Sequence, residues 1–287
     1  MLCEYTYLLE VNMKRGPKPK PQGNCIVCDK ITTLKRDFYC STCYSRKLRN
    51  GEIKKIEKKE LPSIFSLKQK DYLIGSLLGD GCLFKDKPTH LPYFSVQRKK
   101  EDIAYSQWEA ELLGDFVCKW YDGKTWDTRT EKFYDWVKLR THRCEIFSSY
   151  YEKWYPNKIK VVPCDIELNS LILAVWFADD GYVRETGKGR LQLKLSTHGF
   201  DLSSVEFLVS LLNLRYNEYF GITMEKGIKP IIYASNAASW AFCEEINSIC
   251  PPIDRKMIWK YVVKKPNTFK INNTLRKIKN GFRVEKN

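Results

Sequence analysis

Residues 73–81 read Leu73-Ile74-Gly75-Ser76-Leu77-Leu78-Gly79-Asp80-Gly81, and a similar stretch, Leu173-Ala174-Val175-Trp176-Phe177-Ala178-Asp179-Asp180-Gly181, begins at residue 173. Each stretch predicts an apolar helix that delivers an aspartate at its C-terminal end. Glycine follows because the chain leaves a helix through a conformation that side chains disfavour. A single copy would be compatible with an ordinary helix that ends in Asp-Gly. Two copies in matched surroundings indicate an internal duplication, which sets the architecture of the chain.

The two aspartates indicate a bound cation. A carboxylate at a helix C-terminus faces the negative end of the helix dipole, which is unfavourable unless a positive charge lies beside it. Two pseudo-symmetric helices packed together would place Asp80 and Asp180 side by side, and paired carboxylates favour a divalent metal. Gly75 and Gly79 share one helix face and allow a close backbone approach, whereas the second copy has Val175 and Asp179 at these positions. We therefore expect an asymmetric helix interface.

The same order of elements is expected after each stretch. In the first repeat, Ser66 and Gln69 predict a capping box, followed by a hairpin over 82–97, a helix near 100–117 with Ile103 inward, strands near 124–129 and 133–140, and a further helix. In the second, Asn169 or Ser170 caps the motif helix, and a hairpin turns at 185–189. Ser203 and Glu206 predict a cap for the next helix, and strands near 222–226 and 228–233 lead to a helix over 237–249.

Positive charge is concentrated at the two ends of the chain. The net charge is +15, from 49 Lys and Arg against 34 Asp and Glu. Residues 1–62 carry 14 basic and 7 acidic residues, and residues 255–287 carry 11 and 1, whereas residues 63–254 carry 24 and 26. Basic ends around a near-neutral core are typical of a nucleic-acid-binding protein, although basic tails also aid solubility. No run of apolar residues is long enough to predict a membrane span.

Cys25-x-x-Cys28 and Cys40-x-x-Cys43 predict a structural zinc site. Each pair can direct two thiolates to one point, and four thiolates suit tetrahedral Zn²⁺. So short a segment has too few apolar groups to fold unaided, so the metal would supply its stability. Free or redox-active thiols are the alternative. Neighbouring basic residues make the module a candidate DNA contact, with a purely structural cap as the alternative. The remaining cysteines are scattered among apolar neighbours, which indicates a reducing intracellular compartment, the cytoplasm or nucleoid, with an organelle also open.

The paired stretches resemble the motifs of the LAGLIDADG homing endonucleases, in the version in which one chain carries two copies. Further segments similar to this family are 155–158 (Tyr-Pro-Asn-Lys), 176–181 (Trp-Phe-Ala-Asp-Asp-Gly), 197–200 (Thr-His-Gly-Phe) and 251–256 (Pro-Pro-Ile-Asp-Arg-Lys). The resemblance covers about residues 64–262. It implies an α+β fold in which a pseudo-two-fold pair of αββαββ(α) repeats forms a saddle of antiparallel sheets. The small zinc-binding module would precede them.

The resemblance also implies a function and its residues. We expect a metal-dependent hydrolase that cuts both strands of DNA across the minor groove. Asp80 and Asp180 would bind Mg²⁺ between protein and scissile phosphates. Gly79 and Asp179 are the further candidate metal ligands, with Asp179 as an auxiliary. Lys160 and Lys256 follow the last helix of each repeat and would support the phosphates, with ordinary surface lysines as the alternative. Gln97 and Thr197 are expected to open the helix after each hairpin, where the family often keeps a polar residue.

The polar faces of the strands are the expected site of DNA readout, because antiparallel ribbons fit the major groove. A solvated strand face is the alternative. The candidates in the two halves are Ser95, Gln97, Lys138, Arg140, Gln192, Lys194, Ser196, Lys226 and Lys229.

We expect a monomer that binds double-stranded DNA and no membrane. The alternative function is a non-cleaving nucleic-acid-binding protein, such as an intron maturase that binds intron RNA or a DNA-binding regulator. The expected segments are a basic Pro-rich arm (1–24), a zinc knuckle (25–49), a charged linker (50–63), the first repeat (64–165), the second repeat (166–262) and a basic tail (263–287).

Overall fold

A computed structural model describes residues 22–33, 39–53, 60–187, 189–225, 227, 229–249 and 251–252. The chain divides into two compact units, residues 1–61 and 62–287. None of the helices in these ranges is both long and apolar enough to span a membrane.

The first unit contains a two-stranded hairpin and one helix. Strands β1 (Gln22–Asn24) and β2 (Ile31–Thr33) pair antiparallel, and helix α1 spans Ser41–Arg49. Cys40 is the N-cap of α1, and its sulfur accepts from the backbone N–H of Cys43 at 3.4 Å. The helix cap therefore places two of the four motif cysteines next to each other.

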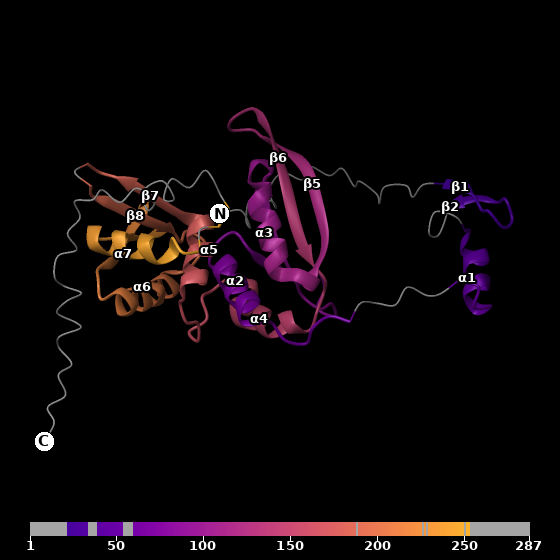
Figure 1. Cartoon of the computed structure of the whole chain (residues 1–287), viewed down its shortest axis with the longest axis horizontal. Helices are drawn as coiled ribbons and strands as arrows, with labels where there is room; N and C mark the ends of the chain where they lie inside the picture. The colour runs from indigo at the N-terminus through magenta and orange to yellow at the C-terminus, as the bar shows by residue number, and fades with distance from the viewer. Residues whose placement is uncertain are drawn as a thin grey trace, which may run out of the picture. The chain divides into compact units, whose positions relative to one another are not determined.

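The second unit contains two repeats with one topology (Figure 1). The elements of the first are α2 (Leu67–Leu78), β3 (Cys82–Phe84), β4 (Tyr93–Lys99), α3 (Ile103–Leu113), β5 (Val117–Asp127), β6 (Lys132–Thr141) and α4 (Ile146–Trp154). Those of the second are α5 (Ser170–Asp180), β7 (Gly181–Glu185), β8 (Leu191–Ser196), α6 (Leu202–Tyr216), β9 (Phe220–Glu225), β10 (Lys229–Ala234) and α7 (Asn236–Ile246). Three short 3-10 turns, η1 (Lys100–Asp102), η2 (Gly114–Phe116) and η3 (Pro156–Lys158), complete the first repeat.

The strand orders β3-β4-β6-β5 and β7-β8-β10-β9 are equivalent, and all pairs within the two sheets are antiparallel. Each sheet buries the apolar side chains of alternate strand residues, such as Leu191, Leu193 and Leu195 on β8, against helices. The predicted α+β class, with two antiparallel sheets in duplicated repeats, is confirmed.

Helices α2 and α5 lie side by side between the two sheets (Figure 1). They approach closely because glycine occupies position 75 of α2 and its C-cap, position 79. A Cβ atom on Gly75 would lie 2.8 Å from both the Ile172 carbonyl oxygen and the Val175 Cβ, and one on Gly79 would lie 2.4 Å from the Asp179 Cβ. The expected asymmetry of the interface is therefore present, with small residues on α2 facing larger ones on α5.

Helix α2 begins with the expected capping box of Ser66 and Gln69, and Asn169 caps α5 as expected. The expected cap of α6 was wrong. Asp201, not Ser203, is the N-cap, and its carboxylate accepts from the backbone N–H of Ser204.

The expected inward face of α3 was also wrong in part. Ile103 is 43% exposed, whereas Tyr105 and Glu109 are fully buried. Glu109 can occupy the core because a buried arginine pairs with it, and hydrophobicity alone does not reveal that arrangement.

Candidate active site at the paired helix ends

Both motif aspartates lie where the motif helices end. Gly79 is the C-cap of α2, and Asp80 follows it with a side chain that is 30% exposed. Asp180 is the last residue of α5, and Gly181 caps that helix. A Cβ at Gly181 would lie 2.1 Å from the Phe177 ring, so glycine is required there by packing.

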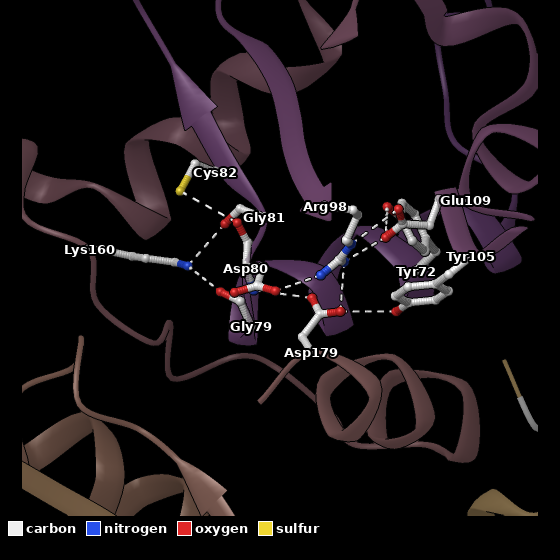
Figure 2. Close-up of polar contacts among 10 residues, drawn as sticks. All are labelled: Tyr72, Gly79, Asp80, Gly81, Cys82, Arg98, Tyr105, Glu109, Lys160 and Asp179. Atoms are coloured by element: carbon white, nitrogen blue, oxygen red, sulfur yellow. Dashed lines mark hydrogen bonds and ion pairs between the residues drawn. The ribbon is translucent and has the colours of Figure 1, made fainter. Parts of the chain in front are cut away.

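Asp179 is buried and connects the two repeats. One carboxylate oxygen, Oδ2, accepts from the backbone N–H of Asp80 at 3.1 Å, and the other, Oδ1, accepts from the Tyr105 hydroxyl at 3.0 Å (Figure 2). The side chain of Asp179 is fully inaccessible to solvent. Asp179 thus fills the space above Gly79 and binds the backbone of the opposite motif.

Arg98 of β4 joins three carboxylates. Its Nη1 lies 2.6 Å from Asp80 Oδ2, and its Nη2 lies 2.6 Å from Asp179 Oδ1 and 2.7 Å from Glu109 Oε1 (Figure 2). The Tyr72 hydroxyl donates to the same Glu109 oxygen at 3.1 Å. The Arg98 guanidinium also lies over the Tyr105 ring, 4.7 Å from its centroid. The cation that the helix end of Asp80 requires is therefore supplied in part by a protein side chain.

Burial dominates the electrostatics of this cluster. It raises the pKa of Asp179 above its ordinary value, an effect that Arg98 opposes and the Asp80 carboxylate reinforces. Burial by itself lowers the pKa of Arg98. The negative charges of Asp179 and Glu109 outweigh this effect and hold the pKa of Arg98 above its ordinary value. Three carboxyl groups, those of Asp80, Asp179 and Glu109, surround the one guanidinium, so the negative charges outnumber the positive one even when Asp179 is protonated. The site thus attracts a cation through its more exposed member, Asp80.

Lys160, expected only to follow the last helix of its repeat, lies at the end of the first motif helix. Its Nζ donates to the carbonyl oxygens of Gly79 at 3.2 Å and Gly81 at 3.0 Å (Figure 2). A lysine that binds the last carbonyls of a helix is favoured by the helix dipole. The Gly79 carbonyl, an expected metal ligand, thus accepts from Lys160. Lys256 lies outside the described residues.

Four residues of this cluster were not predicted from the sequence: Arg98, Glu109, Tyr72 and Tyr105. A signal for Arg98 was present, because strand alternation puts it on the same face as the buried Phe94 and Val96. A charged residue on a core face predicts buried partners. Helical spacing of four likewise places Glu109 on the face of Tyr105.

Strand register corrects the expectation for Gln97 and Thr197. Gln97 lies within β4, opposite Lys138, and Thr197 follows β8, so neither opens a helix. The first hairpin pairs Cys82 with Ser95, and the second pairs Tyr182 with Lys194. Counted along the strand from these equivalent pairs, Gln97 corresponds to Ser196 and Arg98 corresponds to Thr197.

In the first sheet, the candidate readout residues Gln97, Lys138 and Arg140 lie on the outward face. Ser95 is only 2% exposed, and its hydroxyl donates to the Leu139 carbonyl, so the assignment of Ser95 to an exposed readout face is wrong. Its neighbours in the register are Cys82 and Arg140.

The sheet also brings Lys119 and Tyr121 opposite Arg140 and Lys138, two candidates that were missed. The cationic groups lie over aromatic rings: Lys138 over Phe84, Arg140 over Tyr93 and Lys119 over Tyr121.

In the second sheet, Gln192, Lys194 and Ser196 alternate with the buried leucines of β8 and are partly exposed. Gln192 accepts from Arg184, and Lys194 lies between Tyr182 and Tyr233 in the register. Lys229 is opposite Glu225. Lys226 lies outside the described residues.

In the first unit, the four cysteine sulfurs all lie within 4.8 Å of one another. The thiols differ strongly. The backbone N–H of Cys40 lowers the pKa of Cys25 to about 6, whereas a hydrogen bond with Cys40 raises the pKa of Cys43 to about 12. Four thiols so close together fit one divalent metal ion, whose charge allows all four to ionise.

These features define a class of protein: a duplicated α+β fold in which two Asp-Gly motif helices pack together and end in carboxylates. The chain matches the model of the LAGLIDADG DNA endonuclease family over residues 70–242, and it belongs to that family.

Several relatives are similar to this chain over half of its length or more. An uncharacterized protein of Methanocaldococcus jannaschii is 30% identical over 191 residues, which cover 65% of this chain and 72% of that protein. The probable intron-encoded endonuclease 1 of Wickerhamomyces canadensis is 28% identical and covers 73% and 92% of the two chains. The cytochrome b mRNA maturase bI2 of Debaryomyces hansenii is 31% identical over 51% of this chain and 56% of the maturase.

Among solved structures, the homing endonuclease I-WcaI bound to its DNA recognition sequence has the same fold. The TM-score is 0.61 at 22% sequence identity, over 77% of this chain and 99% of that chain.

Proposed function

We propose that the protein is a site-specific endonuclease that hydrolyses phosphodiester bonds in both strands of DNA. The observation that carries the proposal is the presence of both motif carboxylates at the ends of helices that pack directly against each other. The family and the likeness to a relative named as a probable intron-encoded endonuclease support it.

The residues at the helix ends fit a hard divalent cation such as Mg²⁺. Asp80 offers a partly exposed carboxylate in a cluster of net negative charge, and Asp180 ends the partner helix. Oxygen ligands of this kind suit Mg²⁺. When bound, the metal would supply activation of water and neutralisation of charge on the scissile phosphate.

The chain's own residues would hold and orient this site. Asp80 and Asp180 would be the metal ligands. The Asp179 carboxylate would support Asp80 by accepting a hydrogen bond from the Asp80 backbone N–H. Lys160 would lie close enough to the first motif to offset charge on a phosphate, because its ammonium already contacts the carbonyls on both sides of Asp80. Lys256 would serve the second motif in the same way.

DNA would lie across the outward faces of the two sheets. In the first, Gln97, Lys119, Lys138 and Arg140 form a polar and basic face; in the second, Gln192, Lys194, Ser196 and Lys229 do so. Amide and cationic side chains on alternate strand positions can reach base edges in the major groove. The arrangement of cations over rings restricts their motion before DNA binds.

A second candidate is a maturase that binds intron RNA and does not cleave DNA. The 31% identity to a cytochrome b mRNA maturase favours it. The two functions make different demands on the motif carboxylates, since RNA binding alone requires neither of them.

Cleavage of a plasmid library with Mg²⁺ tests the proposal, with wild type beside Asp80→Asn and Asp180→Asn. We expect site-specific double-strand cuts by wild type and a loss of at least about 100-fold in both variants, with DNA affinity retained, because each variant removes a charge from a metal ligand. Tight DNA binding by wild type without cleavage in any divalent metal would overturn the proposal. Binding to intron RNA would then support the maturase.

A further inference from the structure

The two repeats carry different residues at one equivalent position of their sheets. In the first repeat this residue is Arg98, which forms an ion pair with Asp80 and has a side chain that is 1% exposed. The equivalent residue in the second repeat is Thr197, whose hydroxyl donates to the Pro230 carbonyl at 2.8 Å. The duplicated fold thus carries a guanidinium in one half and a neutral hydroxyl in the other.

Arg98 is part of a connected buried structure. Its guanidinium bonds Glu109 through two nitrogens, with Nε–Oε2 at 3.4 Å and Nη2–Oε1 at 2.7 Å, and Tyr72 holds the same carboxylate. It also reaches Asp179 across the helix interface. Because Glu109 and Asp179 are both fully buried, the guanidinium has little freedom to move.

This structure anchors Asp80 at two points. Arg98 holds carboxylate oxygen Oδ2 at 2.6 Å, and Asp179 holds the Asp80 backbone N–H at 3.1 Å. Because Arg98 binds Oδ2, a metal ion would be expected to bind the other oxygen, Oδ1. Restriction of a ligand carboxylate by a hydrogen-bonded partner is a recognised means of orienting a metal ligand.

We propose that Arg98 is a positioning residue for Asp80 only, and that hydrolysis of one DNA strand depends on the Arg98–Glu109–Asp179 cluster while hydrolysis of the other strand does not. This inference rests on the proposed endonuclease function. It follows from the bond between the cluster and Asp80 and from the neutral Thr197 at the equivalent place in the second repeat.

The test measures the nicking rate of each strand separately, on a supercoiled plasmid that carries the target found in the library. For Arg98→Lys, which keeps the charge but loses the planar fork, we expect the ratio of the two nicking rates to change roughly 10-fold or more, the scale of losses on removing such partners. An unchanged ratio, with both rates lowered equally, would overturn the proposal, because a merely structural role affects both strands alike.

Two further variants separate positioning from folding. Arg98→Gln leaves two buried carboxylates without their cation, so the double variant Arg98→Gln/Glu109→Gln, which removes one charge of each sign, is measured beside it and is expected to shift the ratio in the same direction. Arg215→Gln is the matched control. Arg215 pairs with Glu245 and donates to the Leu168 carbonyl in the second repeat, so its loss is expected to lower stability but leave the ratio unchanged.

A second readout does not need cleavage. Mn²⁺ is titrated into protein bound to its selected DNA site and followed by electron paramagnetic resonance. We expect Arg98→Lys to change the affinity of one Mn²⁺ site roughly 10-fold or more and to leave the other site as in wild type. Equal changes at both sites, or no bound Mn²⁺ in wild type, would overturn the proposal. Wild type that binds Mn²⁺ at two sites and never cuts would instead overturn the endonuclease function alone.

Discussion

At the scale of single residues, small side chains decide how closely the repeats approach. Gly75 and Gly79 let the backbone of α2 come near α5, and Asp179 occupies the space above Gly79. The same close approach brings Asp179 to the backbone of Asp80, so packing and site geometry depend on the same atoms.

We predict that Gly75→Ala destabilises the protein by about 1–3 kcal/mol, the usual cost of overpacking a core. The added methyl would lie 2.8 Å from the Ile172 carbonyl oxygen, which is backbone and cannot rotate away. Urea unfolding followed by tryptophan fluorescence measures the change. Gly199→Ala is the control, since a methyl there meets nothing within 4 Å. Equal stabilities of the two variants would contradict the prediction.

At the scale of elements, side-chain caps define where helices of both repeats begin. Helices α2, α5 and α6 begin with side-chain caps, supplied by Ser66, Asn169 and Asp201 in that order. Hydrogen bonds from the hydroxyl and the backbone of Ser204 lower the pKa of Asp201 below its usual 3.8. The lowered pKa stabilises the folded state only while the Asp201 carboxyl group is ionised. This stabilisation is present above pH 3.8 and is lost as the pH falls through the lowered pKa.

We predict that Asp201→Ala lowers the free energy of unfolding by about 1 kcal/mol at neutral pH. The difference from wild type should shrink as the pH falls below 3.8, where the cap becomes protonated. Urea titrations at several pH values measure it. Asp201→Asn should stay close to wild type, because asparagine caps helices well. A Ser203→Ala variant that loses more than Asp201→Ala would show that the cap is assigned to the wrong residue.

At the scale of the whole molecule, the chain combines a cysteine module, a duplicated core and basic ends. In the described part of residues 1–61, the buried apolar cluster consists of three cysteines, whereas residues 62–287 bury a large apolar cluster. Stability from metal is therefore expected to matter for the first unit and not for the second.

We predict that the protein binds one zinc ion and that Cys25→Ser/Cys28→Ser abolishes that binding. The unfolding transition of the second unit should remain within about 2 °C of wild type in calorimetry, since its core does not include these residues. Zinc is counted by mass spectrometry under native conditions, with Cys164→Ser, a substitution at an exposed cysteine, as the control. Full zinc content in the double variant would contradict the proposed zinc site.

We also predict that the basic C-terminal tail contributes to DNA affinity through charge. Residues 263–287 hold eight Lys and Arg and one Glu, a net charge of +7. Log affinity falls as log salt concentration rises. Deleting the tail should make this slope less steep, by about 0.9 for each phosphate that the tail no longer neutralises. Fluorescence anisotropy at several salt concentrations measures the slope. A deletion that weakens binding without changing the slope would assign the tail another role.

The sequence by itself determined the duplication, the order of elements, the four-cysteine module and the two motif carboxylates. Local patterns carry all of these, because helix periodicity, strand alternation and Asp-Gly endings depend on neighbouring residues. Only the tertiary structure decided that Arg98 joins Asp80, Asp179 and Glu109, that Ser95 is covered and that Lys160 reaches the end of α2. Those interactions join residues from separate elements, and a buried charge is tolerable only where the fold brings its partner to it.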